Sequence, residues 1–170
     1  MERKENKLSA NSLTFIALTN EYCHAVEQVL HMDRDQFVAQ MLKLLPRIYI
    51  TASDTDAMAG YGDFYMEQSL EEDAYDQIRD AIAALMAEED VYLEVMVEDM
   101  KYSDTPIATA VSENLADLYQ EFFNFVQAVK DAPTEVQQEL IEQCKEHFID
   151  YWGQTLVNVL RALHHLYYTT

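Results

Sequence analysis

The chain has 170 residues, 49% of them hydrophobic, and its 11 basic and 31 acidic residues give a net charge of -20. This length and composition are typical of one globular domain with its own core, and no stretch is apolar for long enough to span a bilayer. The charge also argues against nucleic acid or anionic lipid as a partner, because both carry phosphate groups that it would repel.

The N-terminal half of the chain predicts two helices. Residues 1–8 are expected to be frayed, and the apolar residues that follow recur every three or four positions, which is the helical period. A second helix is expected to begin after Asp33, a favoured N-cap residue. Pro46 lacks an amide hydrogen and crowds the carbonyl group of Leu42, so we expect this helix to kink or break there.

Residues 53–68 are predicted to form the main loop, since they contain two of the three glycines and several acidic residues. The aromatic residues Tyr61, Phe64 and Tyr65 of this loop would most simply cover the edge of the core. They are also candidates for a ligand site or for self-association. Ser69 and Glu72 then fit a capping box at the start of a third helix.

Residues 90–101 fit two structures. Apolar residues alternate at positions 91, 93, 95 and 97, as in a half-buried strand, but Leu93, Met96, Val97 and Met100 also share a helical face. No second convincing strand appears elsewhere in the chain, and a lone strand has no hydrogen-bonding partner. We therefore expect a helix here.

Two further helices are predicted in the C-terminal third. One is expected to begin after a cap at Asp104 and Thr105, with Pro106 in its first turn. The last helix is expected to begin at a capping box of Thr134 and Gln137 and to run for about 50 Å. The sequence thus predicts an all-α, single-domain bundle of about six helices with a long C-terminal helix, in which Gly153 costs about 1 kcal/mol relative to alanine unless close packing requires it.

The negative charge is concentrated in one third of the chain. Between Ile48 and Met100 there are fifteen acidic residues and one basic residue, Arg79, so this segment carries a charge of -14. A solvated face that maintains solubility is the simpler interpretation. The functional hypothesis is a non-enzymatic interaction or regulatory module whose acidic segment binds a basic protein partner.

Familiar motifs for catalysis, metals and cofactors are missing. Glu21 and His24 form one Glu-x-x-His pair where a di-iron site needs two, and Cys144 and His147 form a lone Cys-x-x-His pair. The calcium-loop, phosphate-loop and nucleophile-elbow patterns cannot be built. We therefore expect no cofactor, and we expect Cys144, like Cys23, to be a buried thiol in a reducing cytoplasm.

One polar arrangement supports an alternative function, a small-molecule binding protein or an unrecognised enzyme. Polar residues of the last helix share a stripe beside Trp152, and those of the preceding helix have similar spacing. If the two helices pack antiparallel, Arg161 would meet Glu113 or Asp117 in a structural ion pair or at the rim of a pocket. The candidate residues for this ligand or partner surface are Trp152, Gln154, Asn158, Arg161, Glu113 and Asp117.

Five segments resemble a bacterial family of unknown function that is frequent in gut Bacteroidetes. They are NEYC at 20–23, LPRIYI at 45–50, DVYLEVMVEDMKYSDTPIA at 90–108, SENLADLYQ at 112–120 and YWGQTLVNVLRAL at 151–163. The resemblance implies a cytoplasmic bacterial protein and supplies no catalytic or binding residues.

Overall fold

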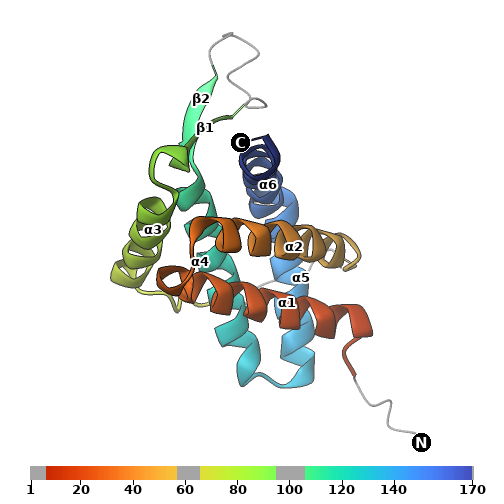
Figure 1. Ribbon diagram of the computed structural model, residues 1–170. Helices are drawn as coiled ribbons and strands as arrows, with labels where there is room; N and C mark the ends of the chain where they lie inside the picture. The colour runs from red at the N-terminus through yellow and green to blue at the C-terminus, as the bar shows by residue number, and fades with distance from the viewer. Residues whose placement is uncertain (1–6, 57–65, 95–105, 170) are drawn as a thin grey trace, which may run out of the picture.

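The computed structural model describes residues 7–56, 66–94 and 106–169 (Figure 1). The helices in these ranges are α1 (Ala10–Glu27), α2 (Arg34–Ser53), α3 (Glu72–Met86), α4 (Val111–Lys130), α5 (Thr134–His147) and α6 (Gly153–Thr169). The two strands are β1 (Val91–Glu94) and β2 (Ile107–Ala110). The predicted helical fold with a long C-terminal helix is confirmed, and the structure adds a small two-stranded sheet.

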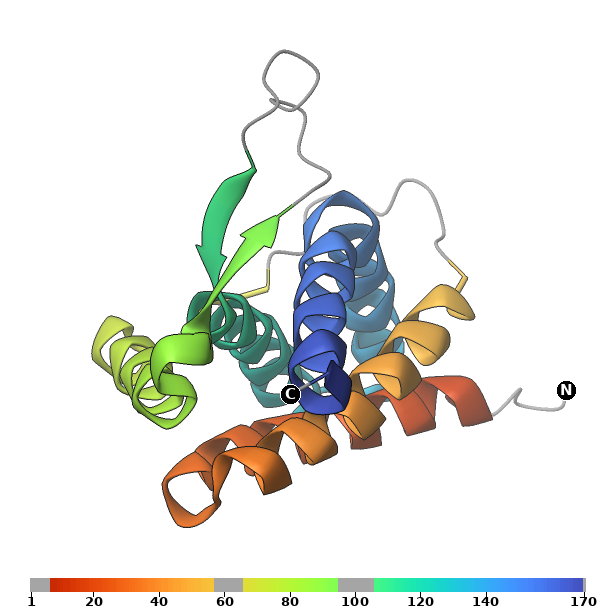
Figure 2. The same cartoon turned by 45° about the horizontal axis from the view of Figure 1, so that its top comes forward.

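The helices form two layers. The antiparallel helices α1 and α2 lie side by side and cross α4 and α6, while α3 packs against the side of α4 that faces away from α6 (Figure 2). The strands extend from one end of the molecule, close to the C-terminal end of α6. This arrangement leaves α3 and the hairpin largely outside the central packing of the other helices.

Aromatic packing around Trp152 holds the layers together. Its indole ring is fully buried and stacks on Phe15 of α1, with ring centroids 6.3 Å apart. Phe122 and Phe148 make edge-to-face contacts with the same ring, and their ring centroids lie 5.0 and 4.8 Å from its centroid. Buried aromatic residues contribute large apolar areas, so this cluster joins α1, α4 and the last helix into one core.

Helix α2 confirms one prediction and contradicts another. Asp33 caps it, because its carboxylate accepts a hydrogen bond from the backbone N–H of Gln36 at 2.8 Å. The predicted break at Pro46 is wrong, since α2 continues to Ser53. Fully buried neighbours such as Leu45 and Ile48 stabilise the helix on both sides of the proline and outweigh the one backbone hydrogen bond that it removes.

The last helix is continuous but changes its winding. A π-helical turn, Phe148–Trp152, connects α5 directly to α6. A Cβ atom on Gly153 would lie 2.5 Å from the carbonyl oxygen of Phe148, so this close approach requires a glycine. The predicted capping box is absent, because the side chain of Thr134 caps nothing and the Gln137 amide instead donates to the Val129 carbonyl at 3.0 Å.

The segment after α3 corrects the helix prediction for residues 90–101. Val91–Glu94 form β1, which pairs antiparallel with β2 in the register Val91 to Ala110 and Leu93 to Ala108. Residues 95–101 lie outside the described ranges. The partner strand Ile107–Ala110 follows Pro106, where the sequence resembled the first turn of the next helix, so the ladder was missed.

Long-range side chains bind backbone amides in the first turn of α4 and in the segment that leads into α3, in place of the local caps that were expected. The Asp90 carboxylate accepts hydrogen bonds from the Ser112 N–H at 2.8 Å and the Ser112 hydroxyl at 2.7 Å, and thereby ties the start of β1 to the start of α4. The predicted capping box of Ser69 and Glu72 is wrong. Instead, the Asn124 carbonyl oxygen accepts from the N–H groups of Ser69 and Leu70, both at 2.9 Å.

Candidate functional site

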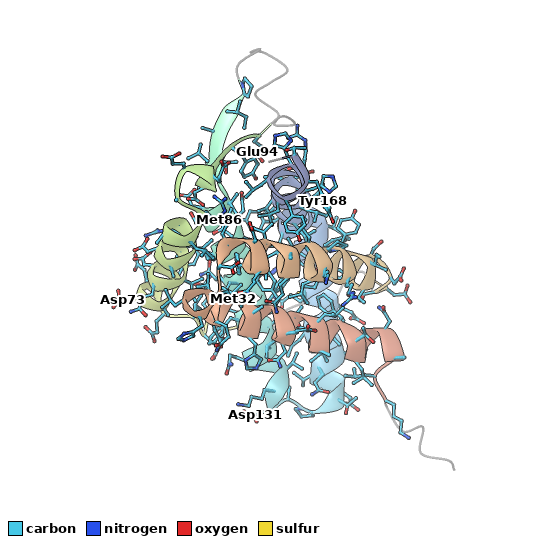
Figure 3. The ribbon with its side chains drawn as sticks, in the orientation of Figure 1. Met32, Asp73, Met86, Glu94, Asp131 and Tyr168 are labelled. Atoms are coloured by element: carbon cyan, nitrogen blue, oxygen red, sulfur yellow. The ribbon has the colours of Figure 1, made fainter. Side chains whose placement is uncertain are left out.

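The acidic residues gather on α3 and on the turn that leads into β1. Between residues 66 and 94 there are ten acidic residues and one basic residue, which gives this segment a charge of -9. Figure 3 shows Asp73 on the outer side of α3. The only cation of the segment, Arg79, lies 3.2 Å from both Asp76 and Asp80, and the Asp80 hydrogen bond raises its pKa. The outer side of α3 therefore presents a negative surface whose one cation is already paired.

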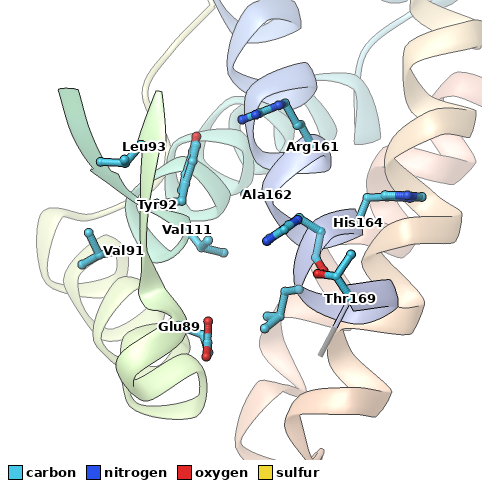
Figure 4. A pocket seen from close by; sticks show the side chains of 11 residues that line it. Glu89, Val91, Tyr92, Leu93, Val111, Arg161, Ala162, His164 and Thr169 are labelled. Carbon is cyan, nitrogen blue, oxygen red and sulfur yellow. The ribbon is translucent and has the colours of Figure 1, made fainter. Parts of the chain in front are cut away.

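An apolar strand face adjoins this negative surface. Val91 and Leu93 are 64% and 55% exposed, and their partners across the ladder are alanines. Figure 4 shows both side chains pointing away from α6. Exposed apolar side chains of this size lie next in the chain to the turn that contains Glu88 and Glu89, and together they form a mixed surface of the kind found at protein–protein interfaces.

The predicted site residues of α4 have structural partners or face solvent. Asp117 accepts hydrogen bonds from the Tyr75 hydroxyl at 2.6 Å and from the Tyr151 hydroxyl at 3.1 Å. Burial, followed by the effect of Asp117, raises the pKa of Tyr151 to about 12. Glu113 is exposed, and neither acid is within 4.0 Å of a cationic group of Arg161. Asp117 therefore connects α3, α4 and the π-helical turn.

The predicted residues of the last helix separate into a core group and a surface group. Trp152 is wholly inside the core, where its N–H donates to the Cys144 carbonyl at 3.1 Å. On the surface, the Gln154 amide donates to Asn158 at 2.8 Å, and the Asn158 amide in turn donates to the Glu94 carboxylate. This chain of hydrogen bonds joins α6 to the end of β1.

Arg161 lines a groove between β1 and α6 with a volume of about 620 Å³ (Figure 4). The predicted pocket lay between α4 and the last helix, but α4 contributes only Val111 to the residues that line this groove. Tyr92 stands between β1 and α6, where its hydroxyl donates to Asn114 at 2.7 Å. Burial raises the pKa of Tyr92 to about 12, whereas the positive charge of Arg161 lowers it.

Of the residues that line the groove, the sequence singled out only Arg161 as a candidate, and Glu89 and Tyr92 are among those that it did not indicate. The alternation in VYLE was the signal that could have placed Tyr92 on the opposite side of a strand from Val91 and Leu93. No local pattern could have placed Glu89 opposite Arg161, because 72 positions separate them in the chain.

The thiols and imidazoles do not form a metal centre in the described part of the chain, where no group of three His, Cys, Asp or Glu side chains is arranged to hold an ion. Cys23 and Cys144 are free and buried, as the sequence predicts. Burial raises the pKa of both thiols, that of Cys23 to about 12. Their unreactive, protonated state does not favour nucleophilic catalysis.

No helix in the described ranges combines the length and the apolar character that crossing a bilayer requires.

The fold and the groove define a helical protein whose two-stranded hairpin lies beside its last helix. The chain belongs to the family described as "Domain of unknown function (DUF5063)", whose model matches residues 6–169. This match confirms the resemblance to a family of unknown function.

A solved structure supports the same assignment. The chain is 33% identical to protein BF1032 from Bacteroides fragilis, whose crystal structure it matches with a TM-score of 0.82 over 95% of each chain. Among curated proteins, none matches this chain. The family and the bacterial relative therefore confirm the fold and supply no activity.

Proposed function

We propose that this protein is a non-enzymatic interaction module that binds a basic, amphipathic segment of another protein. The observation that carries the proposal is the adjacency of the acidic outer side of α3 to the exposed apolar face of β1. Lysine and arginine side chains of the partner would contact the acids of α3, and its apolar side would cover Val91 and Leu93.

Charge and exposure both support this surface. The segment of residues 66–94 carries -9, and its single cation is paired within α3, so a cationic partner would find many carboxylates without a partner of their own. The two apolar residues of β1 expose more than half of their surface. Burying them would add hydrophobic stabilisation to an electrostatic encounter.

The same charge favours protein over nucleic acid as the partner, because a molecule with a net charge of -20 repels a phosphate backbone. We further propose that the module acts in the cytoplasm of a bacterium. Two buried, unpaired cysteines support a reducing compartment.

Charge reversal on α3 tests the proposal. We expect the variant Glu71→Lys/Glu72→Lys/Asp73→Lys to lose the basic proteins that the wild type captures from a bacterial lysate at 50 mM NaCl. Each captured protein would be purified and titrated against both forms to establish direct, salt-sensitive binding. A second variant, Val91→Ser/Leu93→Ser, should weaken the same interactions without changing their salt dependence.

A matched control changes the charge by the same amount elsewhere. Asp131→Lys/Glu146→Lys/Asp150→Lys alters three exposed acids outside α3 and should retain the partners. If the α3 variant keeps every captured partner, the acidic surface is not the binding site. If both triple variants lose the partners equally, net charge alone governs the capture.

A further inference from the structure

The last helix lies over one face of β1, and a groove lies between the two elements. Tyr92 projects from this face toward α6 (Figure 4). Glu94 on the same face accepts a hydrogen bond from Asn158 and so holds the strand against the helix. The groove has a volume of about 620 Å³, which is within the range of small-molecule sites in proteins. It is therefore large enough for a small ligand.

The floor of the groove is apolar. Val111 of α4 is 2% exposed and Leu166 of α6 is 9% exposed, and Ala162 lies one turn before Leu166 on the same side of the helix. The side chains of these three residues carry no polar group that could bind a ligand. An aliphatic chain placed on them would remove apolar surface from water, so the floor favours an aliphatic ligand.

Arg161 places a cation at one end of the groove. Its side chain extends from α6 toward Tyr92 (Figure 4), and among the described residues no carboxylate lies within 4.0 Å of its guanidinium group. Helix α6 contains no acidic residue, whereas every other α-helix in the described ranges contains at least one. In a chain with a net charge of -20, this end of the groove is therefore a local site for a negative group.

Glu89 makes the other end of the groove negative. Figure 4 shows it at the opposite end from Arg161. No cation of the described part of the chain lies within 4.0 Å of its carboxylate, so its charge is not neutralised by an ion pair there. A negative ligand group would be attracted to Arg161 and repelled by Glu89.

We infer that this groove binds an aliphatic monocarboxylate, whose carboxylate pairs with Arg161 and whose chain lies on the apolar floor. Guanidinium groups bind carboxylates through two parallel, charge-assisted hydrogen bonds. The Tyr92 hydroxyl already donates to Asn114 at 2.7 Å, so Arg161 supplies the polar contact and the tyrosine ring supplies a wall. No residue of α3 lines the groove, and this site goes beyond the partner surface proposed above.

The spacing along α6 sets the length of the aliphatic chain. Leu166 follows Arg161 by five residues, a rise of about 7.5 Å. An extended aliphatic chain advances by about 1.3 Å per carbon, slightly less than the length of its bonds, so about six carbons span this rise. A second carboxylate at the far end of such a chain would lie on the Glu89 side. The groove should therefore select monocarboxylates over dicarboxylates.

Titration of the isotope-labelled full chain with hexanoate, followed by NMR, tests this site. We expect saturable shifts of the amide signals between Arg161 and Leu166, with a Kd on the order of 1 mM for a ligand of about eight non-hydrogen atoms. Hexan-1-ol lacks the charge, acetate lacks the chain, and hexanedioate adds a second charge. Each of these three compounds should bind at least about tenfold more weakly than hexanoate.

Single substitutions test the two ends separately. Arg161→Gln should weaken hexanoate binding about tenfold and leave the weak binding of hexan-1-ol unchanged, because only the charged contact is lost. Glu89→Gln should bring the affinity for hexanedioate to within about twofold of that for hexanoate. Arg47→Gln and Glu88→Gln are matched controls that do not line the groove and should keep wild-type affinities. All four side chains are exposed, so these variants should fold, which thermal melting verifies.

Three results would overturn the inference. The first is the absence of saturable shifts up to 20 mM hexanoate, and the second is an affinity for any of the other three compounds that equals that for hexanoate. The third is a loss in Arg161→Gln that is the same for hexanoate and hexan-1-ol. The Glu71→Lys/Glu72→Lys/Asp73→Lys variant should still bind hexanoate, so failure at this groove is distinguishable from failure of the α3 surface.

Discussion

Ala87, at the end of α3, has a backbone conformation that alanine rarely adopts. Its φ of 51° and ψ of -124° are close to the first central position of a type II′ turn, which strongly favours glycine. The strain lies at the point where the chain leaves α3 and enters the turn toward β1. The orientation of the hairpin relative to α3 therefore depends on a strained residue.

Substituting Ala87 with glycine should stabilise the protein. Relief of strain outweighs the extra conformational entropy of glycine in the unfolded chain, and we expect the free energy of unfolding to rise by about 1 kcal/mol. Urea denaturation measures the change. Ala83→Gly, within α3, should instead lower it by about 1 kcal/mol. Equal losses in the two variants would show that Ala87 is not strained.

The pair of His147 and Glu121 makes part of the stability dependent on pH. The Nδ1 atom of His147 lies 3.3 Å from the Glu121 carboxylate, and this hydrogen bond raises the pKa of His147. The protonated imidazole is therefore favoured in the folded state. Its stabilising contribution is complete below the unfolded pKa of about 6.5 and is lost as the pH rises through the higher folded pKa.

Glu121→Gln should lower the pKa of His147, as followed by NMR titration. The stability difference between wild type and variant should be larger at pH 5.5 than at pH 9, and below about 1 kcal/mol because the pair is partly exposed to solvent. A difference that is independent of pH would contradict this account.

At the scale of elements, the last helix depends on its π-helical turn. The extra residue of that turn brings the Phe148 carbonyl to the position where a side chain of residue 153 would begin. Helix propensity alone would favour alanine here by about 1 kcal/mol. The contact with a backbone atom, which cannot move aside as a flexible side chain can, reverses that preference.

Gly153→Ala should therefore destabilise the protein by about 2 kcal/mol, which thermal and urea unfolding would measure. The neighbouring Gln154 is exposed, and Gln154→Ala should change the stability by less than about 0.5 kcal/mol. A Gly153→Ala protein as stable as the wild type would show that the helix can rewind into a regular α-helix.

Elements with a local signal were predictable from the sequence. The apolar stripes gave the helices, and Asp33 gave the start of α2. The errors arose where distant residues decide the structure. Asp90 accepts hydrogen bonds from Ser112, and Asn124 accepts one from Ser69, so the start of α4 and the segment before α3 depend on partners that no short stretch of sequence contains. β1 was mistaken for a helix because its partner strand, Ile107–Ala110, resembled the first turn of the next helix.

The candidate site was predictable only in part, for the same reason. The helical spacing of the sequence placed Asn158 and Arg161 as neighbours on one side of a helix, and both lie on α6. What faces them is decided by the hairpin, so Glu94 and Tyr92 stand where Glu113 and Asp117 were expected. The residues that line a groove formed by tertiary packing have no fixed spacing in the sequence, so no motif reveals them.

For the whole molecule, a net charge of -20 implies strong self-repulsion in the folded state. Raising NaCl from 10 to 300 mM should screen it and increase the Tm by about 3 °C, measured by scanning calorimetry. The α3 triple reversal brings the charge to -14, and its Tm should depend less on salt. A Tm that falls with salt would mean that attractive ion pairs dominate the folded state.

The two buried thiols can report on local unfolding of the protein, because each becomes accessible to reagents only when the packing around it opens. A reagent that alkylates thiolates can reach Cys144 only after the packing around Trp152 separates, whereas Cys23 needs only the opening of α1. Mass spectrometry distinguishes the two labelled peptides, so the labelling rates give separate opening free energies for two regions of one unmodified chain. The same measurement works inside a living cell, where no purified partner or ligand is required.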